Sequence, residues 1–192
     1  RLRHIAERAD VGEQKEMLLA AEIPEEPGSF RRFCGVIGKR GITEFNYRYS
    51  DSSKAHVFVG VQLRHGLKER EDILRSLAEA GYTVADLSDN ELAKLHVRHM
   101  VGGRSTGIAN ERLFRFEFPE RPGALMDLLD AIGRDWNISL FHYRKHGSDW
   151  GRILAGIDVP QQETAELEAH LARLGYAHFE ESENPAYEMF LA

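Results

Sequence analysis

The sequence contains a single cysteine, Cys34, among its 192 residues. One cysteine cannot form a disulfide within the chain, so stability has to come from a packed core. The scarcity of cysteine is typical of a reducing compartment and predicts a cytoplasmic location. Cys34 lies on the apolar stripe of a predicted helix, which predicts a buried and unreactive thiol rather than a nucleophile.

Long hydrophobic runs and an excess of basic residues are also missing. The longest apolar runs are the length of a strand, too short to span a bilayer, and predict that no membrane is a partner. Lysine and arginine number 25 against 31 acidic residues, giving a formal charge of −6. Nucleic acids and anionic membranes need a concentrated positive field, so we expect no nucleic-acid partner.

A complete catalytic set is absent as well. An enzyme acting alone needs a nucleophile, an acid/base pair, a metal cluster or a cofactor loop. Two histidine pairs, His96 with His99 and His142 with His146, have no third ligand at a recognisable spacing. The glycine-rich stretches GVIGKRG and GGRSTG follow neither a dinucleotide nor a phosphate-loop pattern. The sequence therefore predicts no catalytic residue, no metal ligand and no cofactor in this chain.

What the sequence does contain is an internal repeat. The stretch beginning IPEEPGSF reappears as FPERPGAL, with the proline-glycine pairs at 27–28 and 122–123 offset by 95 positions (122 − 27 = 95). The tyrosine-arginine pairs at 47–48 and 143–144 are offset by 96 (143 − 47 = 96), so one residue has been added between the two motifs. A repeat of this length indicates two diverged copies of one structural unit.

Each copy predicts the element order β-α-β-β-α-β. Alternating apolar residues indicate strands, and apolar residues recurring at intervals of three and four indicate amphipathic helices. This order is the ferredoxin-like plan. The predicted fold class is therefore α+β, with two ferredoxin-like units whose antiparallel sheets carry helices on one face. The expected elements cover residues 17–23, 30–37, 42–50, 55–63 and 67–80, and 113–118, 125–132, 137–145, 152–159 and 163–174, each copy closing with a short strand.

The two proline-glycine corners are candidate binding sites. Glycine lets a ligand approach the backbone closely, and a helix N-terminus offers N–H groups to a carboxylate. Ser29 and Phe30 follow the first corner, and Ala124 and Leu125 follow the second, where they could line a small apolar pocket. The alternative is a tight turn with an ordinary helix start, which is common.

Aromatic residues on the strands after these corners allow more than one interpretation. Phe45, Tyr47, Phe141 and Tyr143 fit plain core packing, since alternating aromatics suit a half-buried strand. The tyrosines also carry a hydroxyl that a ligand could use. Some RNA-binding modules share this arrangement, but the negative charge and the missing basic-aromatic signature argue against RNA.

Several stretches together resemble the regulatory part of the biosynthetic threonine dehydratases (threonine ammonia-lyases), which consists of two tandem domains related to ACT amino-acid-binding modules. The resemblance covers nearly the whole chain and includes TEFNYR, LSDNELAKLHVRHMVGGR, WNISLFHYR and NPAYEMFLA. It implies a connecting helix from an absent catalytic domain at 1–15, an ACT-like subdomain at 16–90, a connecting helix and linker at 91–110, and a second ACT-like subdomain at 111–192.

The resemblance also implies a function. The family converts threonine to 2-oxobutanoate with pyridoxal phosphate on a catalytic domain, so this chain would not be an enzyme by itself. It would bind isoleucine as a feedback inhibitor and valine as its antagonist, within a homo-oligomer that is a tetramer in the parent enzyme. Two alternatives stay open: a free-standing ACT-type module for a different ligand, and an unrecognised enzyme.

The resemblance further implies which residues serve this function. In the family, one tyrosine from each copy takes part in effector binding, and these map onto Tyr47 and Tyr143. Arg98 and Arg144 match positions where changes loosen feedback, and Arg98 is expected to couple the effector to the rest of the enzyme. The expected effector-binding residues are Pro27, Gly28, Ser29, Phe30, Phe45, Asn46, Tyr47, Arg48, Gly123, Ala124, Leu125, Phe141, His142, Tyr143 and Arg144.

Overall fold

The computed structural model describes residues 15–50, 54–99, 102–145 and 149–192. The connecting helix expected at 1–15 therefore lies almost wholly outside the described residues. None of the described helices is both long and apolar enough to cross a membrane.

The described elements follow the predicted order in both halves. The first half contains β1 (Glu16–Pro24), α2 (Ser29–Ile37), β2 (Ile42–Arg48), β3 (Lys54–Gln62), α3 (Gly66–Glu79), β4 (Thr83–Asp86), α4 (Glu91–Leu95) and the 3-10 turn η1 (Val97–His99). The second half contains β5 (Glu111–Pro119), α5 (Ala124–Ile132), β6 (Asn137–Arg144), β7 (Trp150–Asp158), the 3-10 turn η2 (Gln161–Glu163), α6 (Thr164–Leu174), β8 (Ala177–Glu180) and α7 (Pro185–Phe190). The α+β class and the two ferredoxin-like units are confirmed. The subdomain boundaries at 90 and 110 stay a prediction.

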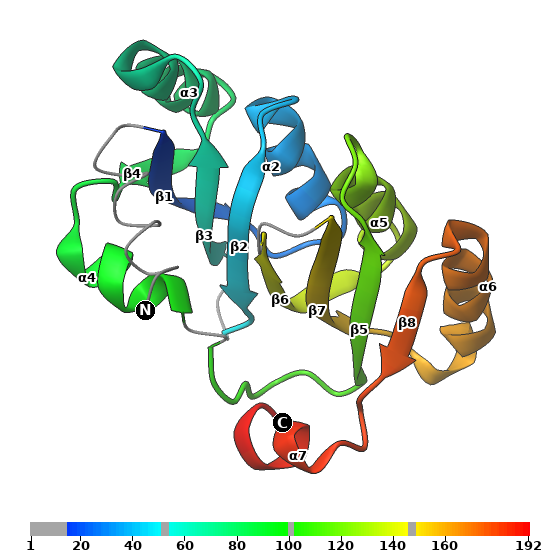
Figure 1. Cartoon of the computed structure of the whole chain (residues 1–192). Helices are drawn as coiled ribbons and strands as arrows, with labels where there is room; N and C mark the ends of the chain where they lie inside the picture. The colour runs from blue at the N-terminus through cyan, green and yellow to red at the C-terminus, as the bar shows by residue number, and fades with distance from the viewer. Residues whose placement is uncertain (1–14, 51–53, 100–101, 146–148) are drawn as a thin grey trace.

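The strands of both halves form one sheet of eight strands in the order β4-β1-β3-β2-β6-β7-β5-β8 (Figure 1). The halves meet where β2 pairs antiparallel with β6. Asn46 pairs with His142 at the centre of this seam, Phe45 pairs with Tyr143, and Tyr47 pairs with Phe141. Tyr47 and Tyr143 are counterparts in the two copies, as are Phe45 and Phe141, and each tyrosine pairs with the phenylalanine of the other copy. The seam therefore has an approximate two-fold axis, like an isologous interface.

The four longer helices cover one face of this sheet. Met17 and Leu19 on β1 belong to the core beneath α2 and α3, whereas Leu18 between them points to the other face and packs with Phe58 and Ala93. Successive side chains of a strand point to opposite faces, so Ala93 places α4 on the second face. The prediction of helices on one face is thus confirmed for α2, α3, α5 and α6, while α4 and α7 lie opposite.

The helices α4 and α7 are counterparts in the two copies. Asn90 and Asn184 cap them by accepting a hydrogen bond from a backbone N–H of the first turn. In the same way Ser88 Oγ accepts from the backbone of β1 at 3.1 Å, and Ser182 Oγ accepts from the backbone of β5 at 3.0 Å. The repeat therefore extends past the last strand, and Asn184 followed by Pro185 is the sequence signal that could have predicted α7.

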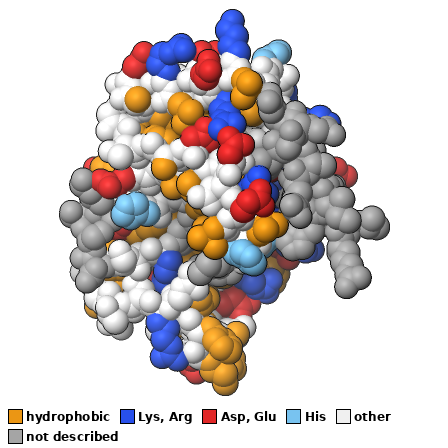
Figure 2. All heavy atoms as spheres, turned by 90° about the vertical axis from the view of Figure 1, so that its left-hand side faces the viewer, with side chains coloured by type: hydrophobic (Ala, Val, Ile, Leu, Met, Phe, Trp, Pro, Cys, Tyr) orange, Lys and Arg blue, Asp and Glu red, His pale blue; other side chains and the backbone are white. Residues whose placement is uncertain are grey.

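The end of α7 exposes two large apolar side chains next to Glu188. Met189 and Phe190 are 61% and 68% exposed. Figure 2 shows hydrophobic side chains gathered at the lower end of the molecule, where Figure 1 places α7.

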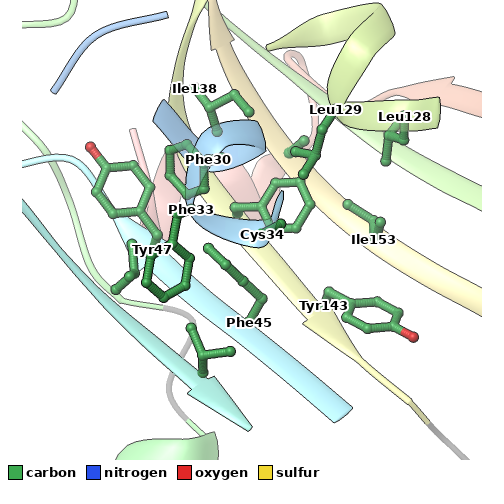
Figure 3. Packing of buried hydrophobic residues seen from close by; sticks show 14 of the residues in the cluster. Phe30, Phe33, Cys34, Phe45, Tyr47, Leu128, Leu129, Ile138, Tyr143 and Ile153 are labelled. Carbon is green, nitrogen blue, oxygen red and sulfur yellow. The ribbon is translucent and has the colours of Figure 1, made fainter. Parts of the chain in front are cut away.

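A single aromatic core crosses the seam between the halves. The Phe30 ring lies 5.3 Å from Phe45, 4.9 Å from Tyr47 and 6.0 Å from Phe141, measured between centroids (Figure 3). Cys34 is buried beside this cluster, and burial raises the pKa of its thiol to about 12, as expected for an unreactive cysteine. The two copies are thus joined by shared side-chain packing as well as by strand pairing.

Candidate functional site

Both proline-glycine corners have the same backbone shape. Gly28 and Gly123 are left-handed, with φ values of 83° and 84°, and each directly precedes its helix. A residue with a side chain would be strained in this conformation. Neither α2 nor α5 has a side-chain hydrogen bond at its N-cap, although the first amides of a helix lack partners within it. In both corners the amide after the glycine already has a backbone partner: Ser29 N–H donates to the Glu26 carbonyl at 3.3 Å and Ala124 N–H to the Arg121 carbonyl at 3.1 Å. Ligand binding by the remaining first-turn amides stays a prediction.

A tyrosine and a glutamate meet beside each corner. Tyr47 Oη donates a hydrogen bond to Glu25, and Tyr143 Oη donates to Glu120 Oε1 at 2.6 Å. Burial and the adjacent carboxylate raise the pKa of both phenols, which therefore stay protonated and act as donors. Figure 3 shows the two hydroxyls pointing away from the aromatic cluster in opposite directions.

Sequence reasoning missed these glutamates. Glu25 and Glu120 each stand two residues before the corner proline, so the repeat itself carried the signal.

The first corner is closed by the protein itself. The Gly28 N–H donates to the carbonyl of Gly133 at the end of α5, in the other half. Asn137 Nδ2 donates to Glu25 Oε1 at 2.9 Å, also across the seam. The guanidinium of Arg32 lies over the corner, 3.2 Å from the hydroxyl of Ser29, and a Cβ added to Gly28 would stand 3.0 Å from it.

The second corner is more open. Gly123 is exposed, and a Cβ built on it meets no atom of the described chain within 4 Å. Each corner has an ion pair between the helix and the residues before it, but the two charges are exchanged between the copies. Arg32 of α2 pairs with a preceding glutamate, whereas Asp127 of α5 pairs with the preceding Arg121 at 2.8 Å. Tyr176 Oη donates to the carbonyl of Ala124 at 3.2 Å and so borders the corner.

Strand alternation separates the expected effector-binding residues into two groups. Phe45, Tyr47, Phe141 and Tyr143 lie in the core on the helix-covered face, near the corners. Their strand neighbours point to the opposite face and are not brought to the corners. Those neighbours are Asn46, Arg48, His142 and Arg144, whose role in effector binding stays a prediction.

Beneath α4 and η1, Arg98 holds two carboxylates on this opposite face. Its Nη2 lies 3.0 Å from Glu16 Oε1 and 2.5 Å from Glu44 Oε1, and its carbonyl accepts from Asn46 Nδ2 at 3.2 Å. Glu44 is only 1% exposed. Burial, opposed in part by Arg98 but reinforced by Glu16, raises the pKa of Glu44 to about 7. The expected coupling residue thus joins η1 to β1 and β2.

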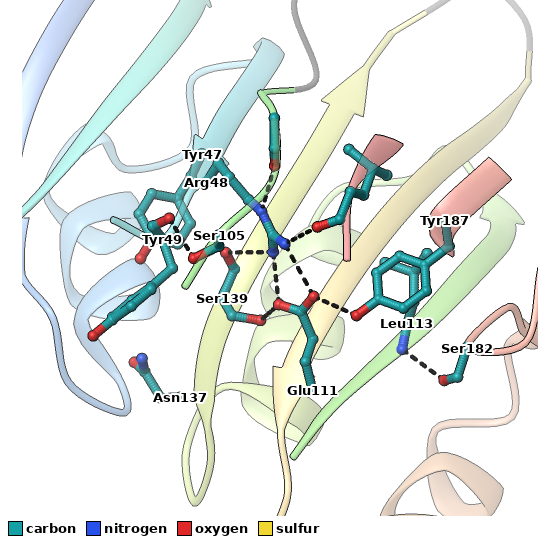
Figure 4. Close-up of polar contacts among 12 residues, drawn as sticks. Tyr47, Arg48, Tyr49, Ser105, Glu111, Leu113, Asn137, Ser139, Ser182 and Tyr187 are labelled. Atoms are coloured by element: carbon teal, nitrogen blue, oxygen red, sulfur yellow. Dashed lines mark hydrogen bonds and ion pairs between the residues drawn. The ribbon is translucent and has the colours of Figure 1, made fainter. Parts of the chain in front are cut away.

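A matching network lies beneath α7 (Figure 4). Arg48 donates to Glu111 at 2.6 and 3.1 Å and to the carbonyl of Leu191 at 2.5 Å, and Tyr187 Oη donates to Glu111 at 2.7 Å. Burial alone would raise the pKa of Glu111, but the hydrogen bonds from Arg48, Ser139 and Tyr187 hold this pKa below its usual value. Because Arg48 is on β2 and Glu111 on β5, the network ties the two halves to α7.

A third contact joins η1 to the seam from the other side. Arg144 Nη1 on β6 donates to His99 Nδ1 at 2.5 Å. Within the described residues, the closest grouping of potential metal ligands is elsewhere, at Asp135, Glu166 and His170, where His170 Nε2 lies 3.2 Å from Asp135 on the surface. His146 lies outside the described residues.

Comparison with known proteins agrees with the duplicated architecture. The family model described as the C-terminal regulatory domain of threonine dehydratase matches residues 7–97 and 102–191. The biosynthetic L-threonine dehydratases IlvA of Burkholderia multivorans and Escherichia coli are 56% and 54% identical over 100% of this chain, which covers 38% and 37% of their lengths. The mitochondrial threonine dehydratase of Saccharomyces cerevisiae is 42% identical over 100% of the chain, which covers 34% of its length. The chain, spanning a little over a third of the bacterial relatives, belongs to the family of C-terminal regulatory domains of threonine dehydratase.

Proposed function

We propose that this chain senses branched-chain amino acids and regulates a threonine dehydratase, with isoleucine as inhibitor and valine as antagonist. The deamination of threonine and the pyridoxal phosphate that it uses belong to the catalytic domain of the same enzyme, and the chain acts within a homo-oligomer. A cytoplasmic location is part of the proposal. The yeast relative is named as mitochondrial, so the compartment differs within the family.

One observation carries the proposal: a regulatory-domain family match over both copies coincides with a duplicated corner suited to an amino acid. Each corner combines left-handed glycine, an uncapped helix start and a buried tyrosine bonded to a glutamate. Backbone N–H groups at a helix start favour a carboxylate, and carboxylates favour an ammonium. An α-amino acid has both groups on one carbon.

The opposite effects of isoleucine and valine need more than one rigid pocket. The two side chains differ by one methylene, whose burial contributes about 0.8 kcal/mol. Two states of the domain, or two sites with different preferences, are therefore required. The networks of Arg98, Arg48 and Arg144 join α4, η1 and α7 to the seam strands β2 and β6. The same strands carry Tyr47 and Tyr143 beside the corners, so a conformational change at a corner can be transmitted to the sheet face opposite the four longer helices.

The direct test is calorimetric titration of the 192-residue chain with isoleucine, valine and threonine. We expect isoleucine and valine to bind and threonine to bind more weakly. A ligand at a hundred times its Kd should add about 2.7 kcal/mol to the free energy of unfolding. Tyr143→Phe should weaken isoleucine binding, whereas Tyr82→Phe, which alters a tyrosine packed on Phe33, should not.

Absence of isoleucine and valine binding at millimolar concentration would reject the proposal. Binding of an unrelated amino acid in a screen of all twenty would favour the free-standing module with a different ligand.

A further inference from the structure

We propose that Glu120 receives the ammonium group of the effector, and that the second corner is the open effector site while the first stays closed. This inference rests on the proposed function, because it assumes that an α-amino acid is the ligand. It adds a residue, Glu120, that the sequence did not suggest, and it separates two corners whose sequences are alike.

The chemistry of the ligand requires an anionic acceptor near the corner. An ammonium group removed from water has three N–H donors to satisfy, and leaving them without acceptors is costly. The backbone N–H groups of the corner suit only the carboxylate of an amino acid. Glu120 stands three residues before Gly123, and Glu25 occupies the same position before Gly28 in the first copy.

Glu120 is held in position and retains acceptor capacity. Its backbone N–H donates to the carbonyl of Asp149 at 2.7 Å, and its Oε1 accepts from Tyr143 at 2.6 Å. An ionised carboxylate has about four acceptor positions, so the phenol leaves room for an ammonium. The tyrosine of the family pattern would then act by orienting this carboxylate.

The backbone of β7 makes room for Glu120. A Cβ at Gly151 would stand 2.8 Å from Glu120 Oε1 and 2.7 Å from the ring of Phe118. Both distances are shorter than a normal contact between non-bonded atoms. Glycine at position 151 therefore allows the carboxylate to lie against the strand beside the corner.

The first corner does not offer the same opportunity. Glu25 Oε1 already accepts from both Tyr47 and Asn137, and the Gly28 N–H donates to Gly133. The counterpart of the Gly28–Gly133 contact at the second corner would involve the C-terminal end of α2. At that end, Arg40 Nη1 donates to the Ile37 carbonyl at 2.9 Å. The approximate two-fold symmetry is thus broken at the corners, with the first corner docked on the other half and the second exposed.

Titrations of the 192-residue chain with isoleucine and with 3-methylpentanoate, its analogue without the ammonium group, test the assignment. We expect the unmodified chain to prefer isoleucine by about ten- to a hundredfold, typical of a hydrogen bond to a charged group. Glu120→Gln should lower the isoleucine affinity by a similar factor and leave the analogue affinity unchanged. Glu117→Gln, on the same strand, should keep both affinities, and thermal unfolding should show that each variant is folded.

The outcomes separate this inference from the proposed function. If the chain binds isoleucine but binds the analogue equally well, no group receives the ammonium and the inference is wrong, whatever the variants do. If Glu25→Gln rather than Glu120→Gln removes the preference, the corner is misassigned. In both cases binding of isoleucine still supports the proposed function, whereas a chain that binds neither compound rejects both.

Discussion

At the scale of single residues, Glu44 is a carboxyl whose protonation depends on the fold. Burial raises the pKa of its carboxyl, and Arg98, which is shared with Glu16, and Arg144 offset that rise only in part. The resulting pKa of about 7, against an ordinary value of 4.5, means that the folded state binds this proton more tightly than the unfolded state. Stability from this group is therefore present below pH 4.5 and lost as the pH rises through 7.

Glu44→Gln should remove this pH dependence. The difference in unfolding free energy between the parent and the variant should fall by about 3 kcal/mol between pH 4 and pH 8, the size of a shift of this magnitude. Urea unfolding at intervals across this range measures it. Glu111→Gln is the contrasting variant, because the pKa of Glu111 is lowered and its contribution is lost as the pH falls. Equal slopes for the two variants would contradict the assignment.

Residue-scale predictions from the sequence succeeded where one physical rule was decisive. The buried state of Cys34 followed from its place on a helical apolar stripe. Treating the consecutive residues Phe45 to Arg48 as one binding group neglected strand alternation, which sends Asn46 and Arg48 to the opposite face. Glu25 and Glu120 were missed because a charged residue before a turn looks like ordinary solvated surface.

At the scale of elements, the central strand of each half depends on a glycine. A Cβ at Gly60 on β3 would lie 2.4 Å from Thr43 Oγ1, 2.9 Å from Glu44 Cγ and 3.0 Å from Glu16 Oε1. The counterpart on β7, Gly156, is crowded in the same way by Ser139. Both glycines lie beside a register shift in the neighbouring strand, between Ile42 and Glu44 on β2 and between Ile138 and Leu140 on β6.

Gly60→Ala should therefore destabilise the fold by about 1–3 kcal/mol, as overpacking does. Gly35→Ala is the matched control: Gly35 lies within α2, and an added Cβ meets no described atom within 4 Å. Alanine there should stabilise the helix by about 0.5–1 kcal/mol. Chemical denaturation of both variants provides the comparison, and a neutral Gly60→Ala would show that β3 tolerates a side chain at this point.

Elements of regular period were predictable, and short ones were not. The four longer helices and the long strands follow from apolar spacing, but the six-residue α7 depends on a cap and on contacts to Arg48 that are far away in sequence. A helix this short is not stable alone, so its existence is decided by tertiary contacts.

At the scale of the whole molecule, the two halves share one core and should unfold together. Phe141→Ala removes a fully buried ring that contacts Phe30 and Phe45 of the first half, and should cost about 3–5 kcal/mol. Trp136 and Trp150 lie in the second half, so their fluorescence should change at the same urea concentration as the circular dichroism of both halves. Phe179→Ala, at a half-exposed position on β8 where the Arg115 guanidinium lies 4.9 Å from the ring centroid, should cost no more than about 1 kcal/mol.

Separate fluorescence and dichroism transitions for the parent chain would show that the halves are independent folding units. The duplication was predictable from the sequence. The choice of β2 and β6 as the joined edges was not, because apolar patterning shows that a strand is buried without showing its neighbour.

The symmetric seam between β2 and β6 also bears on the ancestry of the domain. Strands that pair about a two-fold axis are the arrangement that two identical polypeptides also form, and duplication and fusion of one gene place it within a single chain. Identical polypeptides must change both partners with every mutation. Fusion removes that restriction, so the two halves can diverge, and the two corners differ: the Gly28 N–H donates to Gly133 of the other half, whereas Gly123 is exposed.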